Sequence, residues 1–208
     1  MSKVLIHLVV GAGCELEAES IEKFLEIYDF DIIKTKLSKD DDFKKILDGT
    51  DIFETTEVLI LCLHGGNFDG EDVFISNQED EKYREEKLKN FSSNVNISDL
   101  NVISTACFTG NTRFSNLFLN AGAKSFLAPK EQIDVKKIIK DLCNFLYLFA
   151  NNFSYCESID ETLNADWLFG KKEVNMKKIK SISVNKVIDN SRFKKGDGWK
   201  SIPKEKRK

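Results

Sequence analysis

Short apolar runs alternate along the first 150 residues with longer stretches whose apolar residues recur at helical spacing. The runs are rich in Val, Ile and Leu, as in strands buried on both faces of a sheet, and cover residues 3–10, 30–34, 57–64, 100–106 and 124–128. The stretches between them predict helices over 15–27, 40–47, 112–120 and 133–149. This alternation predicts an α/β fold, a three-layer α/β/α sandwich with a mostly parallel central sheet.

The first predicted helix follows a glycine turn at residues 11–13. The third glycine of the dinucleotide-binding pattern GxGxxG is missing, so a close turn of the backbone explains these glycines better than a nucleotide site does. The apolar residues of the helix fall on one side and predict its buried face: Leu16, Ile21, Phe24 and Leu25.

Turn residues at 67–70 separate the third strand from a short hairpin arm predicted over 72–76. Residues 78–90 are highly charged, with Glu/Lys pairs at helical spacing, and predict either an exposed helix or a flexible loop open to proteolytic processing.

Beyond residue 166 the alternation breaks. We therefore expect one domain over 1–166, an extension over 167–190 that adds edge structure at 167–170 and 179–187, and a mobile basic tail over 191–208.

Two of the apolar runs end next to residues whose side chains can take part in catalysis. His64 and Gly65 follow one strand, and Cys107 follows another 43 positions later, with Gly110 just beyond it. The carboxyl ends of parallel strands are where α/β proteins bind ligands. A thiol and an imidazole at one sheet edge are the parts of a cysteine nucleophile and its acid/base, whereas the alternative is a buried structural cysteine and a turn histidine.

His64-Gly65 and Ala106-Cys107-Phe108-Thr109-Gly110 resemble the motifs of the caspase-like cysteine peptidases, most closely those of the CHAT branch. The resemblance continues through residues 118–127, with their Ala-Gly-Ala turn, to Asp134, and covers about residues 1–150. The family's tryptophan before the acidic residue is absent, and the predicted helix over 79–89 has no counterpart.

The resemblance implies a caspase-like fold and a thiol protease with Cys107 and His64 as its catalytic dyad. By the same resemblance, the backbone N–H groups of Gly65 and Cys107 hold the oxyanion. Acidity at Asp134 implies a pocket for a substrate Arg or Lys, although Asp134 is equally suited to capping the helix that follows. The acidic residues of the hairpin are further candidates for this pocket: Asp69, Glu71 and Asp72.

Two other functions remain open. Cys107 and Arg113 have the Cys-x5-Arg spacing of cysteine-dependent phosphatases, in which loop N–H groups and the arginine bind the phosphate. That reading leaves His64-Gly65 without a role, and no Asp-Pro acid loop is present. The second of these is a non-catalytic interaction module that keeps the fold as a scaffold.

The cysteines indicate neither a disulfide framework nor a zinc site of ordinary spacing, because the chain has five and no CxxC pair. They fit a reducing cytoplasm, with some as small core residues, and no cofactor or metal is expected. No apolar run approaches the 18 residues of a membrane span, and the apolar start is too short for a signal peptide.

Charge is unevenly distributed. Residues 171–208 hold 14 basic and 4 acidic residues, a net of +10, which leaves −13 over 1–170. A solvated tail is the simplest reading, and nucleic-acid contact is the weaker alternative. The resemblance implies a prokaryotic regulatory or defence system, so we expect a protein substrate and a regulatory protein partner, with Trp167, Trp199 and the tail as docking elements.

Overall fold

The computed structural model describes residues 4–38, 42–49, 51–52, 55–75, 82–84, 97–151, 158 and 166–171. All of them belong to one compact unit, Met1–Lys172, and a second unit comprises Glu173–Lys208. The edge structure predicted over 179–187, the basic tail over 191–208, Trp199 and Cys156 lie outside the described residues.

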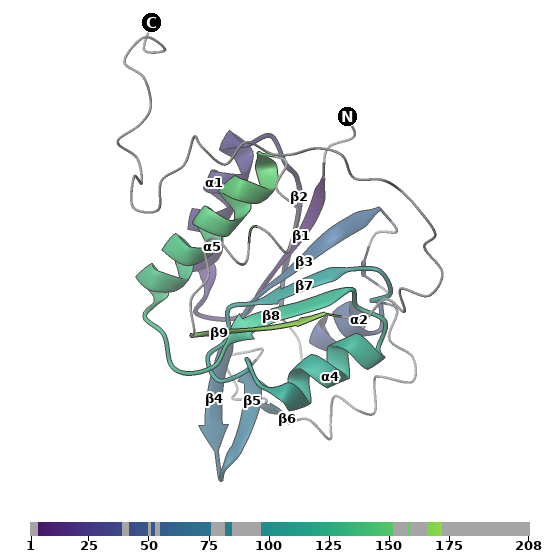
Figure 1. Cartoon of the computed structure of the whole chain (residues 1–208), viewed down its shortest axis with the longest axis vertical. Coiled ribbons are helices and arrows are strands. Elements are labelled where there is room, and N and C mark those ends of the chain that lie inside the picture. Colours follow the sequence, from purple (N-terminus) through teal and green to yellow (C-terminus); the bar gives the residue numbers. More distant parts are fainter. Residues whose placement is uncertain are drawn as a thin grey trace, which may run out of the picture. The chain divides into compact units, whose positions relative to one another are not determined.

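A six-stranded sheet forms the centre of the first unit, with strand order β2-β1-β3-β7-β8-β9 (Figure 1). Five strands are parallel: β1 (Leu5–Val10), β2 (Asp31–Lys36), β3 (Thr56–Cys62), β7 (Asn101–Ser104) and β8 (Ser125–Pro129). At one edge β9 (Trp167–Lys171) pairs antiparallel with β8. The α/β class and the mostly parallel sheet expected from the sequence are confirmed.

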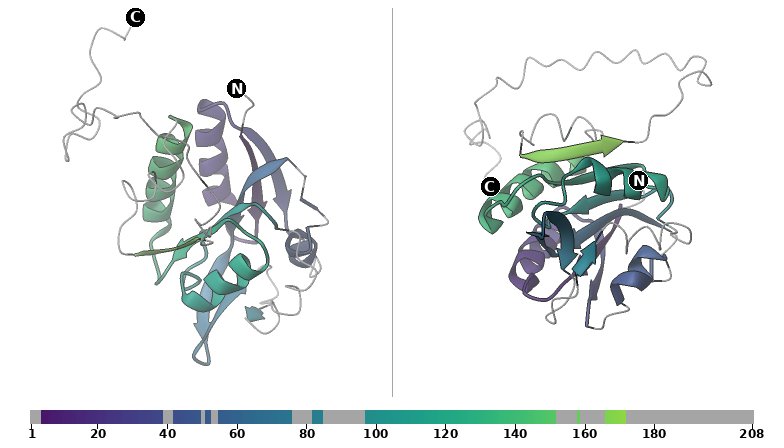
Figure 2. Two further views of the ribbon diagram at one scale, coloured as in Figure 1. Left: turned by 45° about the vertical axis from the view of Figure 1, so that its right-hand side comes forward. Right: turned by 90° about the horizontal axis from the view of Figure 1, so that it is seen from below.

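Helices cover both faces of this sheet, which is compatible with a three-layer sandwich (Figure 2). The helices are α1 (Glu15–Ile27), α2 (Asp42–Leu47), α4 (Thr112–Asn120) and α5 (Val135–Ala150). Alternate side chains of β3 show the two interfaces. Val58, Ile60 and Cys62 pack in the core below α1 and α5, and Leu59 and Leu61 pack in the core below α2 and α4.

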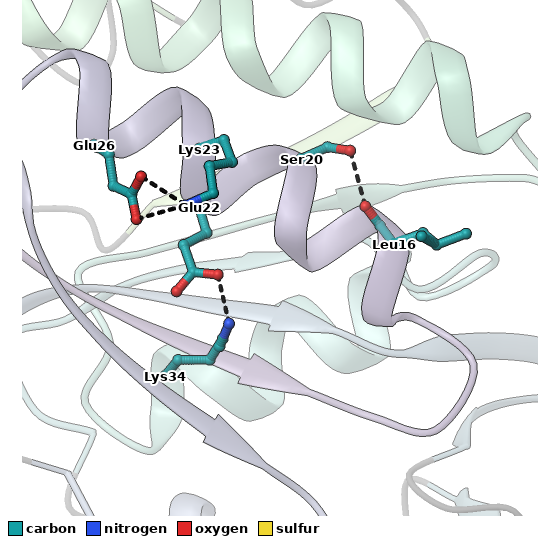
Figure 3. A network of polar contacts seen from close by, with 6 residues as sticks. All are labelled: Leu16, Ser20, Glu22, Lys23, Glu26 and Lys34. Atoms are coloured by element: carbon teal, nitrogen blue, oxygen red, sulfur yellow. Dashed lines mark hydrogen bonds and ion pairs between the residues drawn. The ribbon is translucent and has the colours of Figure 1, made fainter.

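Polar contacts join α1 to the neighbouring strand β2. Glu22 of α1 pairs with Lys34 of β2 (Figure 3), and Glu15 pairs with Lys36 at 2.9 Å. Within the helix, Lys23 pairs with Glu26. Ion pairs at the protein surface contribute little to stability, so the apolar contacts hold the helix on the sheet.

The buried face of α1 differs from the predicted one at its first turn. Ile21 and Leu25 are fully buried as predicted, but Leu16 is 81% exposed. The positions three and four residues before Ile21 are Ala18 and Glu17, and these two are buried instead. Helical geometry therefore turns a carboxyl inward and a leucine outward.

A small antiparallel sheet follows β3 directly, built from β4 (His64–Phe68), β5 (Glu71–Ile75) and β6 (Lys82–Arg84). Asp69 and Gly70 connect β4 to β5 with φ angles of 54° and 79°, as a two-residue Asp-Gly hairpin turn requires. The turn and the hairpin arm predicted from the sequence are confirmed.

The helix predicted over 78–90 is wrong at residues 82–84, because their backbone pairs antiparallel with β5 as β6. An open strand edge offers unpaired backbone groups, and the sequence spacing of charges does not reveal it. The other residues of that segment lie outside the described residues.

Phe74 anchors the hairpin in the core. Its ring lies 5.9 Å from that of Phe43, 4.9 Å from that of Phe114 and 6.2 Å from that of Phe118, measured between centroids. Aromatic pairs at these separations and tilted angles attract beyond their burial. The hairpin that begins with His64 is therefore fixed to α2 and α4.

Trp167, expected to dock a partner, is instead part of the core. It is 5% exposed, and its Nε1–H donates to Asp141 of α5 at 3.2 Å. Lys137 donates to the same carboxylate at 2.8 Å and pairs with Asp166 at 3.0 Å. Residues 167–171, assigned from the sequence to an extension, thus complete the edge of the central sheet, where edge structure was expected.

His7, a fully buried residue of β1, makes the fold sensitive to acid. Burial lowers the pKa of the imidazole below its ordinary 6.5, although Asp51 opposes this, and Nε2 bonds Thr35 Oγ1 at 2.8 Å. The unfolded chain takes up this proton near pH 6.5 and the folded chain resists it. The free energy of unfolding should therefore fall as the pH drops below 6.5, by at most about 1.4 kcal/mol per pH unit for this group.

Urea unfolding of the wild type and of His7→Gln between pH 5 and pH 8 measures this effect. The His7→Gln variant should show a shallower loss of stability on acidification. His64→Gln is the matched control, because His64 is exposed and is the only other histidine of the chain. Equal slopes for the wild type and His7→Gln would contradict the assignment.

Candidate functional site

His64 begins β4 immediately beyond the end of β3, and its side chain is exposed. Its ring lies against the turn that follows β1, since a Cβ atom on Gly13 would be 2.8 Å from His64 Nε2. Gly13 also has a φ of 79°, a conformation that favours glycine. The imidazole of His64 therefore packs against the predicted glycine turn.

Gly65 lies directly against the backbone of Cys107. A Cβ atom on Gly65 would be 2.0 Å from the carbonyl oxygen of Cys107 and 2.9 Å from its nitrogen. β3 and β7 are hydrogen-bonded neighbours, so the segments after them meet at one sheet edge. The structure thus brings the predicted His64-Gly65 and Cys107 segments side by side, including the two N–H-bearing residues predicted to hold an oxyanion.

The Cys107 side chain is half-buried, and its thiol donates to the carbonyl of Ile133 at 3.8 Å. Among the described residues the thiol has no hydrogen bond with His64. In an unliganded catalytic site such contacts are often loose and tighten only when substrate binds. The Cys107 thiol and the His64 imidazole therefore lie on neighbouring segments but are not hydrogen-bonded to each other.

Two buried hydroxyls hold the loop that carries Cys107. Ser104 Oγ accepts from the N–H of Ala106 at 3.1 Å, and Thr109 Oγ1 donates to the carbonyl of Ala106 at 2.7 Å. The hydroxyls themselves lie 3.1 Å apart. Phe108, the residue after the cysteine, has a φ of 65°, which is rare for a bulky residue and persists only where the surroundings enforce it.

Three successive backbone N–H groups after Phe108 are already occupied within the protein. Those of Thr109, Gly110 and Asn111 donate to backbone carbonyls, Gly110 to Pro129 at 2.6 Å. The Asn111 side chain caps α4 by accepting from the N–H groups of Arg113 and Phe114, both at 3.0 Å. A phosphatase loop directs its N–H groups at the phosphate, so these five N–H groups are not free to serve the Cys-x5-Arg alternative, which itself stays a prediction.

Asp134 caps α5, since its side chain accepts from the N–H of Lys136 at 2.8 Å. The capping role weighed from the sequence is thus confirmed. Asp134 is also exposed and adjacent to Ile133, whose carbonyl contacts the Cys107 thiol. A pocket role for Asp134 stays a prediction.

The acidic residues of the hairpin have different positions. Asp72 accepts from the Asn67 amide at 2.8 Å and from the Asn111 amide at 3.0 Å, which ties the hairpin to the loop after Cys107. Asp69 lies in the turn at the far end of β4, five residues and about 16 Å of extended strand from His64. Their role in a pocket for a basic side chain stays a prediction, with Asp72 the nearer of the two to the site.

The other described thiols are held in the protonated form. Burial, with the nearby acidic residues, raises the pKa of Cys14 to about 12, and burial raises that of Cys143 to about 11 and that of Cys62 well above its ordinary range. Cys14 and Cys62 are buried, as expected for core cysteines. Among the described thiols, electrophiles should therefore react first with Cys107.

Sequence reasoning missed three polar residues beneath the site: Glu17, Ser104 and Thr109. Of these, only the burial of Glu17 could have been predicted from the sequence, because Glu17 lies four residues before Ile21 and therefore on the same face of α1. In the described part of the chain, no group of three His, Cys, Asp or Glu side chains could hold a metal ion. None of the described helices combines the length and apolar composition of a membrane span.

The hydrogen bonds of Ser104 and Thr109 with the Ala106 backbone lead to a testable prediction. Thr109→Val keeps the shape of the side chain but removes its hydroxyl, so we expect a loss of about 1–3 kcal/mol in the free energy of unfolding. The freed loop should also slow the reaction of Cys107 with iodoacetamide several-fold, and Thr109→Ser should restore most of the rate. Urea unfolding and mass spectrometry of the alkylated chain measure the two effects.

Ser125→Ala is the matched control for Thr109→Val. Its buried hydroxyl bonds Asn101 at 2.8 Å at the other end of β7 and β8, so stability should fall while the reactivity of Cys107 stays unchanged. A Thr109→Val variant that behaves like this control would contradict the role of the Thr109 hydroxyl in holding the Cys107 loop.

No family model matches this chain, and no curated protein matches it.

Proposed function

We propose that the chain is a caspase-like cysteine peptidase, closest to the CHAT branch, that hydrolyses peptide bonds of a protein substrate. Cys107 is the nucleophile and His64 the general acid/base. The observation that carries the proposal is the close approach of Gly65 to the Cys107 backbone, where an added Cβ atom would lie 2.0 Å from the Cys107 oxygen. That contact sets an imidazole-bearing segment and a thiol-bearing segment against each other at the carboxyl edge of the sheet.

The reaction follows from the groups at this edge. His64 takes the proton of the Cys107 thiol, the sulfur attacks the substrate carbonyl carbon, and the N–H groups of Gly65 and Cys107 stabilise the oxyanion. His64 gives that proton to the leaving amine, which departs and leaves a thioester on Cys107. His64 then takes a proton from water, the hydroxide adds to the thioester carbonyl, and the proton returns to the Cys107 sulfur as the carboxylic acid departs. Acidic residues near the site, Asp134 above all, would favour a substrate Arg or Lys.

Three observations favour the peptidase over the phosphatase. The loop N–H groups of Thr109, Gly110 and Asn111 are bound within the protein, as described above. The segment that carries His64 packs on the thiol-bearing loop through Gly65, and the phosphatase alternative gives this histidine no role. The other described thiols are buried or have raised pKa values, so Cys107 is the described thiol best suited to act as a nucleophile.

The proposal extends to the protein's setting. We place the enzyme in the cytoplasm of a prokaryote, within a regulatory or defence system. By the same resemblance, a separate protein partner supplies the regulation.

Parallel assays on the full chain test the function. A peptide mixture with varied residues before the cleaved bond reports peptidase activity, and an aryl phosphate reports phosphatase activity. We expect peptide products that disappear in Cys107→Ala and persist in Arg113→Ala. Aryl phosphate hydrolysis that disappears in Arg113→Ala and survives in His64→Ala would replace the peptidase by the phosphatase.

A further inference from the structure

Asp72 is a carboxylate of β5 whose two oxygens are both bound to side-chain amides. Oδ1 accepts from the Asn67 amide at 2.8 Å, and Oδ2 accepts from the Asn111 amide at 3.0 Å. Asn67 belongs to β4, the strand that begins with His64, and Asn111 lies four residues after Cys107. One carboxylate therefore joins the hairpin that carries the histidine to the loop that carries the cysteine.

The register of the hairpin directs Asp72 toward α4. Asn67 lies opposite Asp72 in the antiparallel pairing of β4 and β5, so the two side chains are on the same face of the hairpin. Phe74 follows two residues later on β5 and lies on that face too. Its ring is 4.9 Å from that of Phe114 in α4, and Asn111 is the N-cap of the same helix. An aromatic contact and a hydrogen bond thus fix the same face of the hairpin to the same helix.

The Asn111 side chain does more than helix capping requires. Its oxygen caps α4, a task that a Ser, Thr or Asp side chain performs as well. Its amide nitrogen takes no part in the cap and donates to Asp72 and, at 3.1 Å, to the carbonyl of Phe108. Phe108 adjoins Cys107 and has the φ of 65° that its surroundings must enforce. The two bonds of the amide nitrogen, rather than the cap, therefore account for an asparagine at this position.

We propose that Asp72 and Asn111 are positioning residues, whose hydrogen bond fixes the hairpin of His64 relative to the loop of Cys107. The inference rests on the proposed function, in which the distance between the imidazole and the thiol governs the reaction. It gives Asp72 a task within the protein rather than in a pocket for a substrate Arg or Lys. A displacement of about 1 Å between reacting groups can lower a rate about 100-fold, so a bond that holds the two segments together should affect the rate measurably.

An exchange of the two groups tests the bond in the full chain, with peptide hydrolysis as the measurement. Asn111→Asp keeps an oxygen for the helix cap but sets two carboxylates against each other, so we expect kcat to fall about tenfold while KM stays within about twofold. Asp72→Asn sets one amide against another and should lower kcat by a similar factor. The double variant Asp72→Asn/Asn111→Asp again pairs an amide with a carboxylate and should return kcat to within about threefold of the wild type.

Asn101→Asp is the matched control, because it makes the same chemical change at the other end of β7, where the side-chain oxygen accepts from Ser125 at 2.8 Å. It should leave kcat unchanged. A double variant as slow as Asn111→Asp would overturn the proposal, and so would wild-type kcat in both single variants. A loss in Asp72→Asn that is confined to peptides with Arg or Lys before the cleaved bond would assign Asp72 to the substrate pocket instead.

Alkylation of Cys107 by iodoacetamide, followed by mass spectrometry, tests the same bond without peptide hydrolysis. The reaction should slow several-fold in Asn111→Asp and recover in the double variant, and equal rates in the wild type and Asn111→Asp would contradict the positioning role. The proposed function fails by a different result, namely a wild-type chain that cleaves no peptide of the mixture.

Discussion

Replacement of Cys107 by alanine is expected to abolish peptide hydrolysis, and His64→Ala to lower kcat/KM by about 1,000-fold or more. The first change removes the only nucleophile at the carboxyl edge among the described thiols, since Cys14 and Cys62 are buried as protonated groups. The second removes the group that donates the proton to the leaving amine. Initial rates on the best peptide of the mixture measure both effects.

Cys143→Ala is the matched control for these two variants. Its thiol is half-buried on α5 and has a raised pKa, so its loss should leave kcat/KM unchanged. Hydrolysis that persists at the wild-type rate in His64→Ala would remove the histidine from the mechanism.

Gly65→Ala should lower both stability and activity. The new Cβ would lie 2.0 Å from the Cys107 oxygen and 3.0 Å from the Ala106 carbonyl carbon, and backbone atoms cannot yield as a flexible side chain can. We expect a loss of about 1–3 kcal/mol in the free energy of unfolding. Displacement of the Cys107 loop should lower kcat/KM about 100-fold. Urea unfolding and peptide hydrolysis measure the two losses.

Gly70→Ala, in the turn of the same hairpin, separates steric from conformational effects. Its new Cβ would meet no atom within 4 Å, but the φ of 79° disfavours any residue except glycine. The variant should therefore lose about 1–2 kcal/mol of stability and keep its kcat/KM. Equal kcat/KM values for Gly65→Ala and the wild type would contradict the close packing of the two segments.

The elements with strong local signals could be predicted from the sequence. The helix over 112–120 has its predicted bounds because Asn111 caps it, and the apolar runs marked five of the six strands of the central sheet. The meeting of His64-Gly65 with Cys107 followed from one rule, that parallel strands end at the same edge.

Features that depend on distant partners could not be predicted. Trp167 is buried because Asp141, 26 residues earlier, accepts its indole N–H. The charge pairs of 78–90 contribute only about 0.2–0.5 kcal/mol each to a helix, less than strand pairing along β5 offers residues 82–84. Glu17 and Leu16 exchange places because the stripe that is buried on α1 depends on how the helix rotates against the sheet.

Covalent labelling of the wild-type chain by peptidyl electrophiles that end in Arg, Lys or Asp, with the modified cysteine located by mass spectrometry, tests the dyad most directly. The account predicts a single label on Cys107, a preference for Arg or Lys at the end position, and loss of the label in His64→Ala. Labelling spread over several cysteines, or labelling of Cys107 that is unchanged in His64→Ala, would contradict it.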